Sequence, residues 1–359
     1  MSNGRSDLSV AKTLVDALRA ALYDFEEVQS RRVVEEVFAD DAIFHLCHPL
    51  GDLQNPQAFY EQAIQPLHRA LPDMERRDYI RMAGTTSQGQ LWVGCGGFYS
   101  GVFVRPWLDI PPTGHLVSMR FHEFYRIDNN AIVEMQALWD IPDVMRQAGA
   151  WPMAPSLGRE WHIPGPATND GIVDTQGDGL REELAISAGQ KACAKVVAML
   201  EAMKRHPAEG GPEVMQMDKF WHPKMNWYGP SGIGSSRGIA GFRHWHQIPF
   251  LSAMPDRGQY VDQITYHFFG EADYVGVTGW PNMIQTLTHD GWMGLVPDNA
   301  RLEMRSLDFW RLEKGLIREN WVLVDLLDVY RQLGVDVFAR LREFNKARPG
   351  GSVAWPLPG

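Results

Sequence analysis

The chain has 359 residues, 45% of them hydrophobic and 22% charged, and its formal net charge is −10. This length exceeds what one hydrophobic core usually covers, so two domains are expected. The negative charge and the lack of any run dense in Lys and Arg exclude a nucleic-acid partner, and the lack of about 18 consecutive apolar residues excludes insertion into a membrane.

Helical periodicity opens the chain at 10–38, where apolar residues recur every three or four positions. A second amphipathic helix is expected at 58–71, because the ring and the missing N–H of Pro72 end a helix. Strands are expected at 90–103, 116–127 and 131–140. The last two are joined by a tight turn at Asp128-Asn129-Asn130, since Asn and Asp tolerate left-handed backbone.

The same order of elements returns in the second half, with helices expected at 184–203 and 239–253. Between the halves, a stretch rich in Pro, Gly and Asp has no sustained period and predicts a linker. The predicted boundaries are a first domain at 10–150, a linker at 151–180, a second domain at 181–345 and a Pro/Gly tail at 346–359.

An internal repeat supports this division. Ile132–Gly149 aligns without a gap to Ile317–Gly334, an offset of 185 residues, and Leu71–Asp73 aligns to Met254–Asp256 at an offset of 183. Helices followed by antiparallel strands predict the α+β fold class, with each copy a curved, mostly antiparallel sheet wrapped around helices. A pocket is expected in each copy, and 13 Trp, 16 Phe and 16 Met residues suit a flat apolar ligand.

Three segments carry a resemblance to a known family. They are Arg237–Phe242 followed by Phe250 and Pro255-Asp256, the loop Phe103–Gly114, and Arg331–Gly334. In this order they resemble the SnoaL-like polyketide cyclase branch of the nuclear transport factor 2-like superfamily. The resemblance implies two tandem cone-shaped α+β-barrel domains that use no metal or organic cofactor, and that act by acid–base chemistry on a hydrophobic substrate or only bind it.

The resemblance also implies positions for the polar residues of each pocket. The family's catalytic aspartate position holds Ala137 and Val322, neither of which carries a proton. A second pocket position holds Glu123 in copy one and Asp308 in copy two. A carboxylate in an apolar cone has its pKa raised towards the range useful for proton transfer. Alternatively, these carboxylates face solvent or pair with an Arg.

At a third pocket position, His45 is expected to form an acid–base dyad with Glu123, in which the carboxylate fixes the imidazole tautomer. In copy two this position falls near Trp227-Tyr228. Tyr228 is placed to donate a hydrogen bond to a substrate carbonyl or phenolate, while Trp227 offers an apolar face. His267 completes the predicted catalytic set. A structural role is the alternative for each of these side chains.

Other side chains are expected to contact the substrate. Arg237 is predicted to orient an anionic group of the substrate or, alternatively, to face solvent or pair with a carboxylate. Of His244 and His246, two apart on the second-copy helix, at most one can face the pocket. The predicted substrate-binding residues are His48, Tyr99, Trp139, Trp227, Arg237, His289 and Trp321.

Two further patterns have structural interpretations. His45, Cys47 and His48 do not predict a metal site, because residues i and i+3 of a strand face opposite ways. Asp140 and Asp325 are expected to cap the helices that follow them, where a carboxylate accepts free backbone N–H groups.

Two classes of function follow. The first is a cofactor-independent lyase or isomerase, of the SnoaL-like cyclase or deformylating type, that moves protons on an aromatic or polyketide-like molecule. The second is a non-catalytic small-ligand carrier or assembly module. The expected partners are a hydrophobic small molecule and the other copy in an internal pseudo-dimer, with a homo-oligomer left open. Three cysteines without a CxxC pair, and an N-terminus without a signal peptide, predict a cytoplasmic protein.

Overall fold

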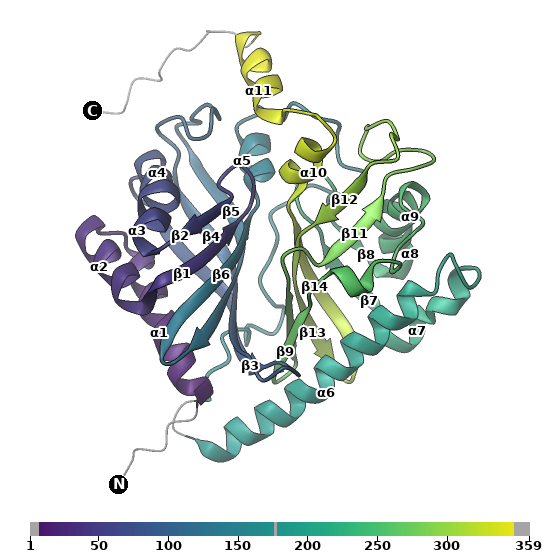
Figure 1. The fold of residues 1–359 in the computed structure, drawn as a ribbon, viewed down its shortest axis with the longest axis horizontal. Coiled ribbons are helices and arrows are strands. Elements are labelled where there is room, and N and C mark those ends of the chain that lie inside the picture. The colour runs from purple at the N-terminus through teal and green to yellow at the C-terminus, as the bar shows by residue number, and fades with distance from the viewer. Residues whose placement is uncertain (1–6, 176–177, 348–359) are drawn as a thin grey trace.

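The computed structural model of the chain describes residues 7–175 and 178–347. Two six-stranded mixed sheets, one in each half of the chain, stand side by side and face each other, with helices over their outer faces (Figure 1). The strand orders are β2-β1-β6-β5-β4-β3 and β8-β7-β14-β13-β10-β9, so the two sheets share one topology. The α+β class and the tandem arrangement are therefore confirmed. The predicted tail falls almost wholly outside the described residues.

The first half begins with two helices instead of the single one expected. Glu26 starts the second helix by accepting the backbone N–H groups of Val28 and Gln29. The elements are α1 (Asp7–Tyr23), α2 (Glu27–Val37), β1 (Phe38–Leu46), β2 (Asp52–Gln54), α3 (Pro56–Phe59), η1 (Tyr60–Ile64), α4 (Gln65–Ala70), β3 (Glu75–Thr85), β4 (Leu91–Val102), β5 (Leu116–Asp128), β6 (Ala131–Trp139) and α5 (Ile141–Gln147).

The second half repeats this order and adds a two-stranded hairpin, β11–β12. Its elements are α6 (Gly179–Lys204), η2 (Pro212–Met215), α7 (Met217–Phe220), β7 (Trp221–Tyr228), β8 (Ser236–Arg237), α8 (Gly238–Phe242), η3 (Arg243–Gln247), α9 (Ile248–Ala253), η4 (Val261–Gln263), β9 (His267–Glu271), β10 (Tyr274–Thr278), β11 (Met283–Thr286), β12 (Arg301–Met304), β13 (Ser306–Glu313), β14 (Leu316–Val324), α10 (Leu326–Gln332) and α11 (Val337–Lys346). None of the helices in the described part of the chain is long and apolar enough to cross a bilayer.

The helix that ends in Pro-Asp contains one π-helical turn in each copy, η1 and η3. A proline, Pro66 or Pro249, stands two residues after each turn. Proline lacks the N–H that an α-helix needs and its ring crowds the preceding turn, so a wider turn relieves both problems. The hydrogen bond that closes η3 runs from the Ile248 N–H to the Arg243 carbonyl, five residues back.

The two sheets meet through a pair of stacked rings. Phe124 of β5 and Phe309 of β13 have centroids 4.8 Å apart and planes inclined by 13°. Gly94 and Gly276 make room for them, because an added Cβ would lie 2.8 Å from a ring carbon of Phe309 and 3.0 Å from one of Phe124, respectively. Phe124 corresponds to Phe309, and Gly94 to Gly276, at nearly the offset of the internal repeat, so the two copies contribute equivalent residues to this contact.

Two aspartates form reciprocal contacts across the same interface. Asp325 accepts the backbone N–H of His48 from the first copy, and Asp140 accepts the backbone N–H of Ser231 from the second. Asp325 also accepts the N–H of Asp328, as the predicted helix cap. The cap prediction is wrong for Asp140, whose carboxylate makes no cap hydrogen bond to its own helix and instead joins the two copies.

A buried ion pair provides another link between the copies. Lys12 of α1 lies 2.6 Å from Glu271 of β9, and both side chains are almost fully buried. Glu271 also accepts the backbone N–H of Ala83, at the edge of the first sheet. An unpaired buried charge is costly, so these contacts stabilise the packing of α1 against the second sheet.

Candidate functional site

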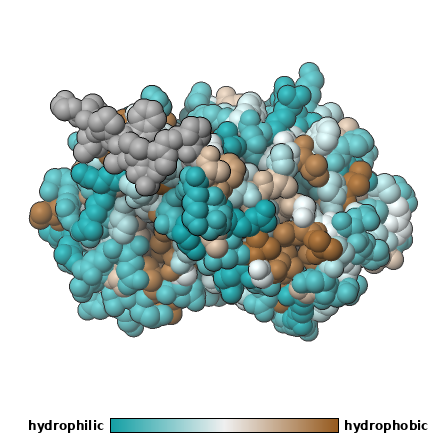
Figure 2. Space-filling view, turned by 90° about the horizontal axis from the view of Figure 1, so that it is seen from above, coloured by the Kyte–Doolittle hydropathy of each residue, from teal (hydrophilic) through white to brown (hydrophobic). Residues whose placement is uncertain are grey.

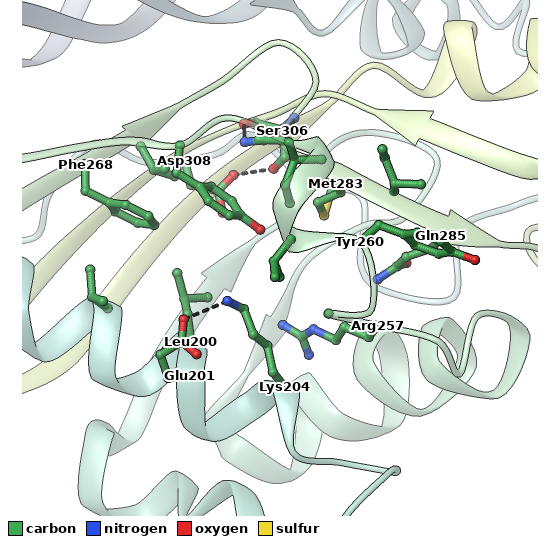
Figure 3. A pocket seen from close by; sticks show the side chains of 18 of the residues that line it. Leu200, Glu201, Lys204, Arg257, Tyr260, Phe268, Met283, Gln285, Ser306 and Asp308 are labelled. Atoms are coloured by element: carbon green, nitrogen blue, oxygen red, sulfur yellow. Dashed lines mark hydrogen bonds and ion pairs between the residues drawn. The ribbon is translucent and has the colours of Figure 1, made fainter. Parts of the chain in front are cut away.

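Two adjoining cavities, each of about 130 Å³, lie in the second copy between α6 and its sheet. The inner cavity is the one that His246 and Val322 line, and the outer cavity is the one that Lys204 and Tyr260 line. An apolar cavity of about 150 Å³ is large enough to hold benzene, so each has room for about one aromatic ring. Their common lining is Leu200, Arg257, Met283, Ser306, Asp308 and Trp310. In Figure 3, α6 supplies Leu200 from one wall, while Ser306 and Asp308 project from β13 on another. The site is therefore an apolar space with a small number of ionisable groups.

The alternation of side chains along β13 places Asp308 in this space. Phe309 packs against the first copy through Phe124, so its neighbours Asp308 and Trp310 point to the opposite face, where they line both cavities. Val322 of β14 lies directly beside Asp308 in the sheet and lines the inner cavity. The predicted placement of Asp308 in a pocket is thus observed.

Asp308 has a single hydrogen-bond partner among the described residues. The hydroxyl of Ser306 donates to it at 2.5 Å, and no ion pair forms with it in this part of the chain. Burial raises the pKa of the Asp308 carboxyl from 3.8 to about 7, and the Ser306 hydrogen bond opposes the shift. A carboxyl group with this pKa exchanges a proton readily near neutral pH.

Arg257 lines both cavities from the segment that follows α9. Asp256 holds this segment against β11 by accepting the Thr286 N–H at 3.0 Å. None of the described residues forms an ion pair or a hydrogen bond with the Arg257 guanidinium, and burial lowers the pKa of Arg257 to about 10. Figure 3 shows Arg257 and Asp308 reaching into the cavity from different walls. A charge is therefore available in the site without a protein partner.

His246 lies in the π-helical turn η3 and lines the inner cavity. Its ring stacks on Trp227 with centroids 4.1 Å apart. Burial lowers the pKa of His246 to about 3, with Arg257 acting in the same direction, so the imidazole is neutral. His244 is exposed and its Nδ1 lies 2.8 Å from the Ala240 carbonyl. The expectation that at most one of these two histidines faces the pocket is confirmed.

A third hollow of about 250 Å³ opens at the surface above the inner cavity. It shares Ile233, His246 and Trp292 with the inner cavity, and Leu157 of the linker and Trp245 border it. Figure 2 shows apolar side chains gathered on this upper face, over the second copy. His246 and Trp292 thus lie between the surface and the carboxylate.

The equivalent space in the first copy is built differently. Glu123 is fully buried, and its carboxylate accepts hydrogen bonds from Tyr99, Tyr125 and Trp139 and pairs with Arg76 at 2.6 Å. Both carboxylate oxygens therefore have partners. Tyr99 and Trp139, predicted to bind substrate, point their polar atoms at Glu123 instead. The arrangement favours the structural alternative for Glu123, a carboxylate paired with an Arg.

The predicted dyad of His45 and Glu123 is wrong. His45 lies 2.9 Å from Asp52 and its ring lies near Trp280 of the second copy. Ala137 of β6 pairs with Glu123 on one side and with Leu46 of β1 on the other, so Leu46 points to the same face of the sheet as Glu123. His45 precedes Leu46 on the strand and therefore points to the opposite face.

Three other predicted residues lie away from the cavities for a similar reason. The Tyr228 hydroxyl donates to Glu319, and the Trp321 indole donates to the Pro164 carbonyl of the linker, on the face opposite the cavity. His267 stacks on Trp92 of the first copy. The predicted pocket positions of Tyr228, His267 and Trp321 are corrected accordingly.

The remaining predicted residues divide between the cavity and the surface. Trp227 lines the inner cavity. Arg237 is exposed and donates to Asn226, and exposed His289 contacts Thr288. The His48 ring lies near Phe338 while its backbone N–H is bonded to Asp325.

The sequence interpretation missed Arg257 altogether and did not single out His246. At the offset of 183 residues, Arg257 and His246 correspond to Met74 and Ala63, which are buried and apolar. An ionisable residue that replaces an apolar one in only one copy was the available signal. No group of three or more His, Cys, Asp or Glu residues suited to a metal ion occurs within 7–175 and 178–347.

Comparisons with known proteins agree with the repeat. The family model described as SnoaL-like polyketide cyclase matches residues 16–148 and 211–333. No curated protein matches the chain. Similar solved structures include IdmH from Streptomyces antibioticus (19% identity, 38% of this chain, 96% of that chain, TM-score 0.33), AclR from Streptomyces galilaeus (16%, 42%, 87%, 0.35) and TsrD from Streptomyces laurentii (16%, 40%, 98%, 0.34).

Proposed function

The chain belongs to the SnoaL-like polyketide cyclase family, and from this premise we propose that its second domain is a cofactor-independent lyase or isomerase acting on an aromatic or polyketide-like molecule. The observation that carries the proposal is Asp308, a carboxylate with a pKa near 7 in an apolar cavity of ring size. The first domain, whose Glu123 is held by Arg76, acts as a structural partner.

Asp308 provides the proton transfer. In its ionised form it takes a proton from a benzylic carbon or a carbon next to a carbonyl, and the electron pair of the broken C–H bond delocalises into the substrate. Return of the proton to another carbon completes an isomerisation, while departure of a leaving group completes an elimination. A substrate that delocalises the charge itself needs no electron sink beyond its own carbonyl or ring.

One observation favours the alternative of a non-catalytic carrier. Val322 lines the cavity at the position of the family's catalytic aspartate, so the usual proton acceptor is absent there. Asp308 stands beside Val322 on the neighbouring strand, and the two functions differ in whether Asp308 reacts or only borders the ligand.

An exchange experiment separates the two functions. A bicyclic aromatic ketone such as 2-tetralone, whose binding is first established by quenching of tryptophan fluorescence, is incubated with the protein in deuterated water. The enzyme accelerates deuterium incorporation next to the carbonyl, and Asp308→Asn lowers that rate about 100-fold or more. Saturable binding with no exchange above the buffer rate supports the carrier.

A further inference from the structure

Three buried donors of the inner cavity lack a hydrogen-bond partner within the described part of the chain. The Nε2 atom of Gln247 and the indole nitrogens of Trp221 and Trp310 are buried and have no hydrogen-bond partner among the described residues. All three residues line the inner cavity, and each is at most 2% exposed. Buried donors without partners are costly, so a ligand rich in acceptor oxygens complements this lining.

Arg257 adds a full positive charge to these donors. It lines both cavities and has no carboxylate partner in the described part of the chain, whereas Lys204, which lines the outer cavity, is paired with Glu201 at 2.6 Å. A guanidinium in apolar surroundings is stabilised by an anion, to which it donates two parallel hydrogen bonds. No carboxylate within 7–175 and 178–347 supplies that anion.

We propose that Arg257 binds an anionic oxygen of the substrate, a carboxylate or a phenolate, and so fixes the aromatic ring against Asp308. The inference names the substrate class of the site and rests on the proposed function. Arg257 and Asp308 approach the cavity from different walls (Figure 3), so one molecule can contact both without the two side chains pairing. Because Arg257 contacts a part of the substrate that does not react, it is a binding residue and Asp308 is the proton carrier.

Binding of matched probes tests this role. Calorimetry compares 1-naphthoate with neutral 1-naphthamide, and 4-nitrophenolate at pH 8 with neutral 4-nitroanisole. A charge-assisted hydrogen bond predicts that the protein prefers the anion of at least one pair by about 10- to 100-fold. The pair that shows the preference identifies the carboxylate or the phenolate as the source of the charge.

Three variants assign the preference to a residue. Arg257→Met is expected to abolish the preference for the anionic probe while the neutral probes bind as before. Arg257→Lys is expected to retain part of that preference. Lys204→Met, which removes a paired cation from the same cavity, retains all of it. Thermal unfolding shows that Arg257→Met is folded and at least as stable as the parent, because it deletes an unpaired charge.

The inference is overturned if neither anion is preferred, or if the preference survives in Arg257→Met. It is distinct from the proton-transfer proposal, because Asp308→Asn keeps the anion preference while it loses deuterium exchange. If Asp308→Asn retains exchange and Arg257→Met loses the preference, the anion site stands and the role of Asp308 falls.

Discussion

Glu123 and Asp308 occupy equivalent positions 185 residues apart, but four side chains donate to Glu123, whereas only Ser306 among the described residues donates to Asp308. Tyr125, one of the four donors, corresponds to Trp310 in the second copy, whose indole nitrogen has no hydrogen-bond partner in the described part of the chain. Glu123 is thus part of a satisfied core network, whereas Asp308 is a partly buried carboxyl group that faces the cavity.

This difference predicts opposite effects of two isosteric amides on stability. Glu123→Gln removes the carboxylate that Arg76 faces at 2.6 Å and leaves Asp78 as the remaining partner of Arg76, so it costs about 3 kcal/mol, the lower end of the usual cost of breaking a buried ion pair. Asp308→Asn at pH 8 removes a desolvated charge and raises the free energy of unfolding. Urea titrations at pH 8 measure both, and equal destabilisation by the two variants contradicts the distinction.

The pH dependence of stability carries a signature of Asp308. Its pKa is about 7 in the folded chain and near 3.8 otherwise, so the folded state binds more protons between these values. Stability from this group therefore falls as pH rises from about 4 to about 7. Buried Asp140 has the same sign, and His246, whose pKa is lowered, has the opposite sign below pH 6.5.

The contribution of Asp308 to stability is the unfolding free energy of the parent minus that of Asp308→Asn, measured at each pH. The difference is expected to decline across pH 4 to 7 and to be flat above. Activity gives an independent reading, since the rate of proton abstraction rises with a midpoint near pH 7. Ser306→Ala moves that midpoint upwards, because the Ser306 hydrogen bond lowers the Asp308 pKa. A midpoint unaffected by Ser306→Ala argues that another group titrates.

The repeat and the element order were enough to predict the fold, because alternation and proline positions are local features of the sequence. Less of the candidate site could be predicted from the sequence. The family resemblance placed Asp308 on the cavity face of its strand, but His45 lies one residue away from the position on β1 that faces Glu123. The filling of the first pocket by Arg76 depends on β3, a strand that the sequence analysis did not delimit. Contacts between residues distant in the sequence decided these cases.

The interface between the sheets predicts a strong effect of one methyl group. Gly94→Ala places a Cβ 2.8 Å from a ring carbon of Phe309 and 3.1 Å from one of Phe124, so the stacked rings must move, at a cost of about 1–3 kcal/mol. Gly179→Ala at the start of α6 is the matched control, since nothing lies within 4 Å of its Cβ. Thermal unfolding of both tests the contact, and equal melting temperatures contradict it.

The final prediction separates the two faces of β7. Tyr228 and Trp227 are adjacent, but Tyr228 donates to Glu319 on the face away from the cavity, whereas Trp227 lines the cavity and stacks on His246. Tyr228→Phe therefore costs about 0.5–1.5 kcal/mol of stability through one lost hydrogen bond, and leaves exchange of the bound ketone unchanged. Trp227→Leu weakens ketone binding, because it removes an aromatic wall of the inner cavity. Exchange rates and binding constants of the two variants test this prediction. A large loss of exchange in Tyr228→Phe with intact binding would contradict it, because Tyr228 would then belong to the catalytic residues and the reaction would take place on the other face of the sheet.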